Sequence, residues 1–247
     1  MVRQSKNSMM VRSLSKGRAA WDFVLDLIFP KFCVGCALEG EWVCPDCLKK
    51  IIRVVTQVCP DCERISEFGR YCETCRKKHK LSGIIVAAYY KEGPIKEAVH
   101  NLKYNNVLEL KEFLGKLMAE ALKNNIDNIG GDILLTAVPM HFLRQAQRGY
   151  NQAEILAEHV AADLKLPRNF KIIKKIRKTK SQVSKSGKKR RESLKNSFKI
   201  IDELAVKNRT IIIVDDVTTT GTTLEECAKV LKTAGAKRVW GLVIARG

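Results

Sequence analysis

The sequence of 247 residues contains no long hydrophobic run. Its most apolar early stretch, Trp21 to Phe29, is interrupted by Asp22 and Asp26 and is far shorter than the roughly 20 residues that span a bilayer. No secretory signal peptide is visible either. We therefore expect no membrane span and a cytoplasmic protein, in which the nine cysteines are reduced or bound to metal rather than paired in disulfides.

Two common phosphate-binding motifs are also missing. No G-x-G-x-x-G follows a predicted strand, and no G-K-[ST] ends a glycine-rich loop. These absences argue against a dinucleotide site and against a Walker-type nucleotide site.

Acidic residues are nearly absent from two segments. Residues 1–20 contain five Lys or Arg and no acid, and residues 165–199 contain fifteen Lys or Arg against Glu192 alone. Together these segments carry the whole net charge of +19, as is typical of anion-binding elements rather than of general solubility. We expect residues 1–18 to form a disordered basic tail and residues 19–29 to form a short amphipathic helix that ends before a proline.

Cysteines, in contrast, are concentrated in four C-x-x-C pairs. Two such turns present four thiolates to one metal, which is the arrangement of structural zinc. The gaps between pairs favour two sequential sites, although a cross-braced pairing stays open. Because so short a segment buries little apolar surface, the metal must supply its folding energy. We predict two structural zinc ions, one held by Cys33, Cys36, Cys44 and Cys47 and the other by Cys59, Cys62, Cys72 and Cys75.

From residue 83 onward, strands are predicted to alternate with helices. Such alternation indicates a mainly parallel sheet covered by helices on both faces. The predicted strands are Ile84–Tyr90, Ile133–Val138 and Ile211–Val214, and the predicted helices are Pro94–Tyr104, Glu109–Lys123 and Asn151–Ala162, with a further helix after Thr223. The ninth cysteine, Cys227, is predicted to be a small packed residue of that last helix.

Two carboxylates, Asp215 and Asp216, follow the buried strand that ends at Val214, and a hydroxyl-rich turn and a helix come next. Such a turn aims backbone N–H groups and the positive end of the helix at one point, which suits a phosphate. The carboxylates would repel a phosphate, but they can accept hydrogen bonds from the vicinal hydroxyls of a ribose. A basic turn with His141, Arg144 and Arg148 follows another strand and would suit a pyrophosphate.

This combination resembles the phosphoribosyl pyrophosphate (PRPP) loop of the type I phosphoribosyltransferases. The resemblance implies that Asp215 and Asp216 bind the ribose and that magnesium accompanies PRPP. It also implies that Arg144 and Arg148 lie on the pyrophosphate side, and that the 5′-phosphate binds to Thr218, Thr219, Thr220, Gly221, Thr222 and Thr223. No residue is assigned a catalytic role.

Four features together resemble the ComF family: the four C-x-x-C pairs, the sequence RGYNQAE, the basic segment, and VDDVTTTGTT. The resemblance implies a double zinc ribbon with its preceding helix over residues 19–80, and a phosphoribosyltransferase-like domain over residues 81–247. It also implies that a mobile loop over Ile176–Arg191 closes on the pyrophosphate. Residues of that loop are Lys180, Ser181, Arg190 and Arg191.

Two functions are compatible with the resemblance. One is a phosphoribosyltransferase whose acceptor the sequence does not identify. The other is a nonenzymatic accessory of natural transformation that holds single-stranded DNA, with a helicase as partner and the PRPP pocket as a sensor or anion site. The sequence gives no role to Lys103, and His79 is interpreted as a surface residue.

Overall fold

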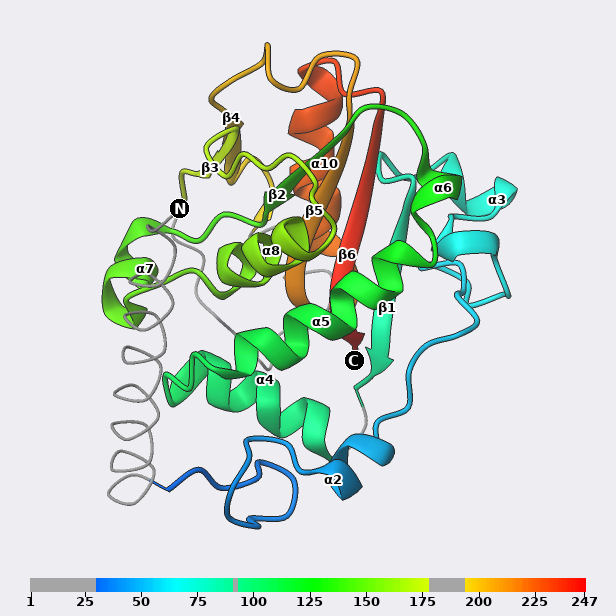
Figure 1. The fold of residues 1–247 in the computed structure, drawn as a ribbon. Helices are drawn as coiled ribbons and strands as arrows, with labels where there is room; N and C mark the ends of the chain where they lie inside the picture. Colours follow the sequence, from blue (N-terminus) through cyan, green and yellow to red (C-terminus); the bar gives the residue numbers. More distant parts are fainter. Residues whose placement is uncertain (1–29, 91–92, 178–193) are drawn as a thin grey trace, which may run out of the picture. The chain divides into compact units, whose positions relative to one another are not determined.

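The computed structural model describes residues 30–90, 93–177 and 194–247 (Figure 1). The chain forms two compact units that divide after Lys49. Several predictions concern residues outside the described ranges: the tail over residues 1–18, the helix over residues 19–29, and the loop residues Lys180, Ser181, Arg190 and Arg191.

The described part of the first unit, residues 30–49, is organised by its cysteines. The chain turns back after Cys33, whose backbone N–H donates to the carbonyl of Leu38 at 2.8 Å. Helix α2 (Pro45–Lys49) follows and buries Cys47. Cysteines make up the buried cluster of this unit, with Val43 packed against them.

The second unit is built on a four-stranded parallel sheet with the order β1-β6-β5-β2. Strands β5 and β6 lie at its centre, and their runs of apolar residues are buried, as expected for parallel strands covered on both faces. The strands are β1 (Gly83–Tyr89), β2 (Ile133–Ala137), β5 (Thr210–Thr218) and β6 (Arg238–Arg246).

Helices cover both faces of this sheet, as Figure 1 shows. Helices α5 (Leu110–Lys123) and α8 (Gln152–Asp163) pack on one face, with α4 (Pro94–Tyr104) against α5. Helix α10 (Thr222–Thr233) packs on the other face. The predicted parallel sheet with helices on both faces is therefore confirmed. Within the described ranges, no helix combines the length and the apolar character that crossing a bilayer requires.

Two segments differ from their predicted local structure. The predicted basic turn is helix α7 (Phe142–Arg148), which begins because the His141 side chain accepts a hydrogen bond from the backbone of Leu143 and ends at Gly149 in the left-handed conformation. Strand β5 continues past Val214 to Thr218, because its backbone stays paired with β6. The short helix α6 (Ile126–Ile129) lies between α5 and β2.

A two-stranded antiparallel hairpin lies beside the main sheet. Its strands are β3 (Ile173–Lys175) and β4 (Phe198–Ile200). Ile173 and Phe198 are buried in the same apolar cluster as residues of β5 and α10. Strands β3 and β4 thus attach to the sheet unit the two stretches of chain on either side of residues 176–197.

The second cysteine cluster belongs to the same compact unit as the sheet. Its segment contains the short elements η1 (Glu67–Gly69) and α3 (Glu73–Arg76). The buried side chain of Gln57 pairs with the backbone of Val86 on the edge strand β1, as donor at 2.9 Å and as acceptor at 3.1 Å. Gly83 pairs with Arg70, and a Cβ at Gly83 would lie 2.4 Å from the Gly69 carbonyl oxygen. This segment, the second ribbon (residues 57–81), therefore covers a sheet edge that would otherwise expose unpaired backbone groups.

Candidate functional site

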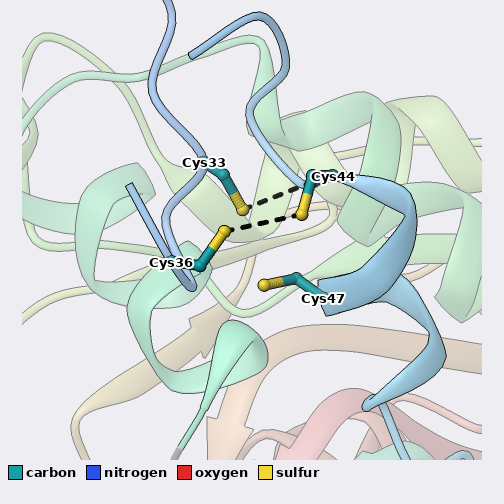
Figure 2. A group of neighbouring side chains, drawn as sticks. All are labelled: Cys33, Cys36, Cys44 and Cys47. Carbon is teal, nitrogen blue, oxygen red and sulfur yellow. Dashed lines mark hydrogen bonds between the residues drawn. The ribbon is translucent and has the colours of Figure 1, made fainter. Parts of the chain in front are cut away.

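The eight cysteines of the C-x-x-C pairs are gathered into two groups in the structure. In each group the four sulfur atoms all lie within 4.8 Å of one another. Figure 2 shows the first group, in which the sulfur atoms of Cys36 and Cys44 are 3.6 Å apart. The groups are Cys33, Cys36, Cys44 and Cys47, and Cys59, Cys62, Cys72 and Cys75.

The two groups repeat the same local structure. The first cysteine of each, Cys33 or Cys59, accepts a hydrogen bond at its sulfur from the backbone N–H of the third, at 3.3 Å and 3.4 Å. The residue four positions after each first cysteine, Ala37 or Glu63, has a positive φ near 60° and donates its backbone N–H to the carbonyl of that cysteine. The repeat extends beyond the cysteine spacing to the backbone itself.

These hydrogen bonds favour the thiolate form of the first cysteine in each group. Burial opposes ionisation of Cys33 and Cys59, but the surrounding backbone N–H donors outweigh it and lower the pKa of each thiol to about 6. Four sulfur ligands at the usual zinc–sulfur distance lie about 3.8 Å apart on a tetrahedron, close to the 3.6 Å and 3.7 Å found for one pair in each group. The two clusters therefore fit two structural zinc ions.

A second set of polar groups lies at the carboxyl end of the central strand β5. Asp215 is partly exposed and Asp216 is buried. The carboxylate of Asp216 is held from two helices, by the Lys103 ammonium of α4 at 2.7 Å and by the Gln152 amide of α8 at 2.7 Å. The ion pair compensates a carboxylate that has left water, which would otherwise be costly.

Lys103 is kept charged by this arrangement. Burial alone would lower the pKa of its ammonium, but attraction to the carboxylates of Asp216 and Asp215 outweighs burial and raises that pKa above its ordinary value. No role was predicted for this lysine from the sequence. A usable signal was present: Lys103 lies four residues after the buried Val99, on the face of α4 that packs inward.

The predicted pyrophosphate-side arginines lie on α7. Arg148 donates to the side-chain oxygen of Gln152 at 2.6 Å, so it is linked through that glutamine to Asp216. Its guanidinium also lies 5.3 Å from the ring centroid of Tyr104. Arg144 is exposed on the same helix. The structure thus connects Arg148 with the acidic pair and gives Gln152 a bridging position that the sequence analysis missed.

The threonine turn, Thr218–Thr223, follows the acidic pair. The Thr218 hydroxyl oxygen accepts from the backbone N–H of Gly221 at 3.1 Å, and the hydroxyls of Thr220 and Thr222 are 2.7 Å apart. Gly221 has a φ of +69°, which favours glycine, and α10 begins directly after it. The first N–H groups of a helix lack intrahelical partners. The turn therefore offers backbone donors beside two carboxylates.

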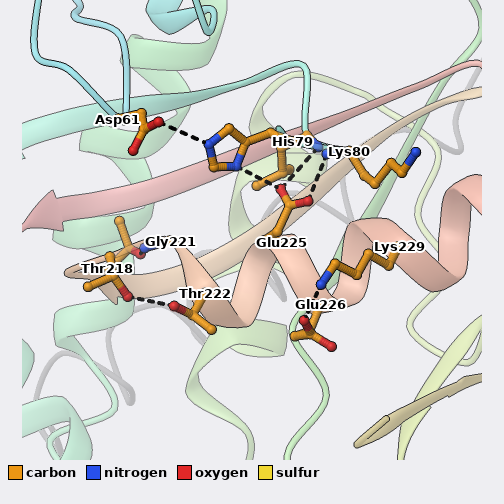
Figure 3. Close-up of polar contacts among 11 residues, drawn as sticks. Asp61, His79, Lys80, Thr218, Gly221, Thr222, Glu225, Glu226 and Lys229 are labelled. Carbon is orange, nitrogen blue, oxygen red and sulfur yellow. Dashed lines mark hydrogen bonds and ion pairs between the residues drawn. The ribbon is translucent and has the colours of Figure 1, made fainter. Parts of the chain in front are cut away.

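Helix α10 is held on its outer side by the second ribbon (Figure 3). The carboxylate of Glu225 accepts from the backbone N–H groups of Lys80 at 2.7 Å and Leu81 at 3.3 Å. His79 has one ring nitrogen 3.5 Å from Glu225 and the other 3.3 Å from Asp61, and its ring stacks on Tyr71 at 4.0 Å. His79, interpreted from the sequence as a surface residue, has a side chain that is 20% exposed and lies between these two carboxylates.

A pocket of about 440 Å³ lies between the second ribbon, the threonine turn and α10. Its lining includes Asp61, His79, Thr220, Thr222 and Glu225.

The side chain of Cys227 on α10 is buried, as predicted, and burial raises the pKa of its thiol well above the ordinary value.

The ion pair at the end of β5 gives the first testable prediction. Changing Lys103 to Met leaves the buried Asp216 carboxylate without its cation, so we expect the free energy of unfolding to fall by about 3 kcal/mol. Urea denaturation measures this change. The matched control is Lys96→Met, which removes an exposed lysine from the same helix. Adding Asp216→Asn to Lys103→Met should restore part of the loss, and equal stability of all three variants would contradict the assignment.

Comparison with known proteins gives two family matches. A double zinc ribbon domain matches residues 24–76, and a phosphoribosyl transferase domain matches residues 149–246. Among solved structures, the glutamine PRPP amidotransferase of B. subtilis is similar over 53% of this chain, with 19% identity and a TM-score of 0.34. The match covers 25% of that protein's length.

Three curated relatives are similar over most of their length. Competence protein F of Haemophilus influenzae is 29% identical over 86% of this chain and 96% of its own. DNA utilization protein YhgH of Escherichia coli K12 is 28% identical over 87% and 98%. Competence protein ComFC of Streptococcus pneumoniae is 26% identical over 81% and 86%. These matches fit a ComF family protein, with a double zinc ribbon domain followed by a phosphoribosyl transferase domain.

Proposed function

We propose that this ComF family protein binds PRPP with magnesium at the carboxyl edge of its sheet and transfers the phosphoribosyl group to an acceptor. The observation that carries the proposal is the meeting of the partly exposed Asp215, the buried Asp216 and the threonine turn at one end of β5. Ligands of doubly wound sheets bind at this edge. The phosphoribosyltransferase domain match, over residues 149–246, includes all of these residues.

In this proposal, groups of the chain bind each of the three parts of PRPP. The vicinal ribose hydroxyls donate to the carboxylates of Asp215 and Asp216, and the 5′-phosphate accepts from backbone N–H groups of Thr218–Thr223 at the positive end of α10. The pyrophosphate faces Arg148, with Arg144 one turn away on α7. Lys103 holds Asp216 in place through the 2.7 Å ion pair.

The chemistry requires positioning and charge compensation rather than a strong acid or base. Magnesium, when bound with PRPP, would neutralise part of the pyrophosphate charge. The chain's own residues fix the ribose and its phosphate at two ends, so that the anomeric carbon is held open to an attacking acceptor. Positive groups on α7 stabilise the negative charge that develops on the leaving pyrophosphate. A cytoplasmic location is part of this proposal, since thiolate clusters persist in a reducing compartment.

Thermal unfolding tests PRPP binding. PRPP with magnesium should stabilise the protein, by about 2.7 kcal/mol at a hundred times the Kd. Changing Asp215 to Asn removes a charged acceptor from the ribose, so we expect PRPP affinity to fall about tenfold or more. Asp163→Asn, at an exposed position on α8, is the matched control and should bind normally. PRPP binding that is equal in both variants would contradict the role of the acidic pair.

A second candidate function is the binding of single-stranded DNA. The three relatives described above carry the word competence or the words DNA utilization in their names, and residues 165–199 of this chain contain fifteen Lys or Arg against one acid. With no aromatic residue other than Phe170 and Phe198 in that segment, binding would be mainly electrostatic and tolerant of sequence. A helicase partner in DNA uptake would belong to this second function.

Fluorescence anisotropy with a labelled single-stranded oligonucleotide tests this function. Binding should fall steeply with salt, and changing Lys188, Lys189, Arg190 and Arg191 to Ala should reduce the salt slope by about 0.7 for each phosphate that the protein no longer neutralises. The matched control changes Lys96, Lys111, Lys116 and Lys123, on α4 and α5, to Ala. Equal salt slopes in the two quadruple variants would show that Lys188, Lys189, Arg190 and Arg191 are not part of the DNA-binding surface. The absence of any DNA binding at low salt would contradict the second candidate function.

A further inference from the structure

The second ribbon lies against the outer side of the threonine turn, at the point where α10 begins. Asp61 is within the Cys59–Cys62 turn, and its carboxylate lies 3.3 Å from a ring nitrogen of His79. The other ring nitrogen lies 3.5 Å from the carboxylate of Glu225. Glu225 is in the first turn of α10 and donates its backbone N–H to the carbonyl of Gly221 at 2.9 Å. A continuous line of contacts thus runs from a cysteine turn to the threonine turn (Figure 3).

A second line of contacts supports the glycine of the turn directly. Tyr71 is 6% exposed and immediately precedes the cluster residue Cys72. Its ring stacks on His79, with centroids 4.0 Å apart and planes 13° apart. A Cβ placed on Gly221 would lie 3.9 Å from the Tyr71 hydroxyl and 3.2 Å from the side chain of Ile84. The left-handed turn at Gly221 therefore lies against Ile84 of β1 and, slightly farther away, Tyr71 of the second ribbon.

We propose that zinc in the second cluster and PRPP at the threonine turn are thermodynamically coupled through His79 and Glu225, which act as positioning residues. A short cysteine-rich segment depends on metal for its folding energy. Without that metal, the ribbon no longer fixes His79 or presents the Lys80 and Leu81 N–H groups to Glu225. The start of α10 then loses its outer support and becomes ordered only when PRPP binds. Because part of the binding free energy is used for this ordering, the affinity for PRPP is lower. Coupling is reciprocal, so PRPP in turn tightens the zinc site.

The first cluster provides an internal control, since it belongs to the other compact unit. Cys36 and Cys62 occupy the same position in the two repeats, and both are exposed. Changing either to Ser should remove one zinc, which elemental analysis measures. The coupling therefore predicts different consequences for PRPP from two chemically identical substitutions. This inference depends on the proposed PRPP binding, and the measurements below separate the failure of one from the failure of the other.

The forward measurement is PRPP affinity in the full chain, determined by thermal shift. We expect Cys62→Ser to weaken PRPP binding at least about fivefold and Cys36→Ser to leave it unchanged. Glu225→Gln should keep both zinc ions and weaken PRPP binding in the same direction, whereas the exposed Glu73→Gln in the same ribbon should not. Equal PRPP affinity in the two cysteine variants would overturn the coupling alone. No PRPP binding to the unmodified chain would overturn both the proposed function and the coupling.

The reverse measurement is zinc release to a chromogenic chelator, and it does not depend on activity. In Cys36→Ser the remaining zinc is in the second cluster, so PRPP should slow its release. In Cys62→Ser the remaining zinc is in the first cluster, so PRPP should have no effect. Adding His79→Gln to Cys36→Ser should abolish the slowing while one zinc is retained, which a purely structural role of His79 does not predict. Release that PRPP does not slow in Cys36→Ser would overturn the coupling.

Discussion

A carboxylate buried at the end of a central strand requires a positive partner, and the ion pair between Asp216 and Lys103 provides it. The pair joins α4 to the end of β5, and Gln152 joins α8 to the same carboxylate. Removing one charge would leave the other uncompensated in a region of low dielectric. The position of Asp215 and of the threonine turn that follows depends on this arrangement, because both continue the same stretch of backbone.

Metal is the second physical constraint on the molecule. The described part of the first unit has a buried cluster made chiefly of cysteines, and the second cluster shares its surroundings with the sheet. Gln57 pairs with β1, and Glu225 of α10 accepts from the backbone that leaves the ribbon. The second ribbon covers one edge of the sheet and supports the start of α10, so the second cysteine cluster and the threonine turn belong to one compact unit.

Local patterns in the sequence predicted much of this fold. Helix α4 has the predicted bounds, Pro94–Tyr104, because its apolar spacing is clear and a proline lies at its start. The parallel sheet was predicted from runs of apolar residues such as Ile211–Val214, which fit strands buried on both faces. The length of β5 was underestimated, since pairing with β6 carries the strand beyond its apolar run to Thr218. Such pairing is a tertiary effect that local composition does not report.

The contacts of charged residues were harder to predict. Lys103 and Asp216 are more than a hundred residues apart, and so are His79 and Glu225. Each residue alone is typical of a solvated helix face or loop. Only the inward position of Lys103 on α4 gave a signal, and nothing local placed His79 beside α10. The grouping of the second ribbon with the sheet likewise depends on backbone pairing, such as Arg70 with Gly83, that cysteine spacing does not encode.

Competition at equilibrium tests the central claim most directly. Isothermal titration calorimetry with PRPP and magnesium should give one binding site per chain, and ribose 5-phosphate should displace PRPP because it presents the hydroxyls and the 5′-phosphate that Asp215, Asp216 and the threonine turn are proposed to bind. The same displacement should weaken in Asp215→Asn. Displacement of PRPP by pyrophosphate but not by ribose 5-phosphate would contradict the account, since PRPP would then be held by positive charge alone.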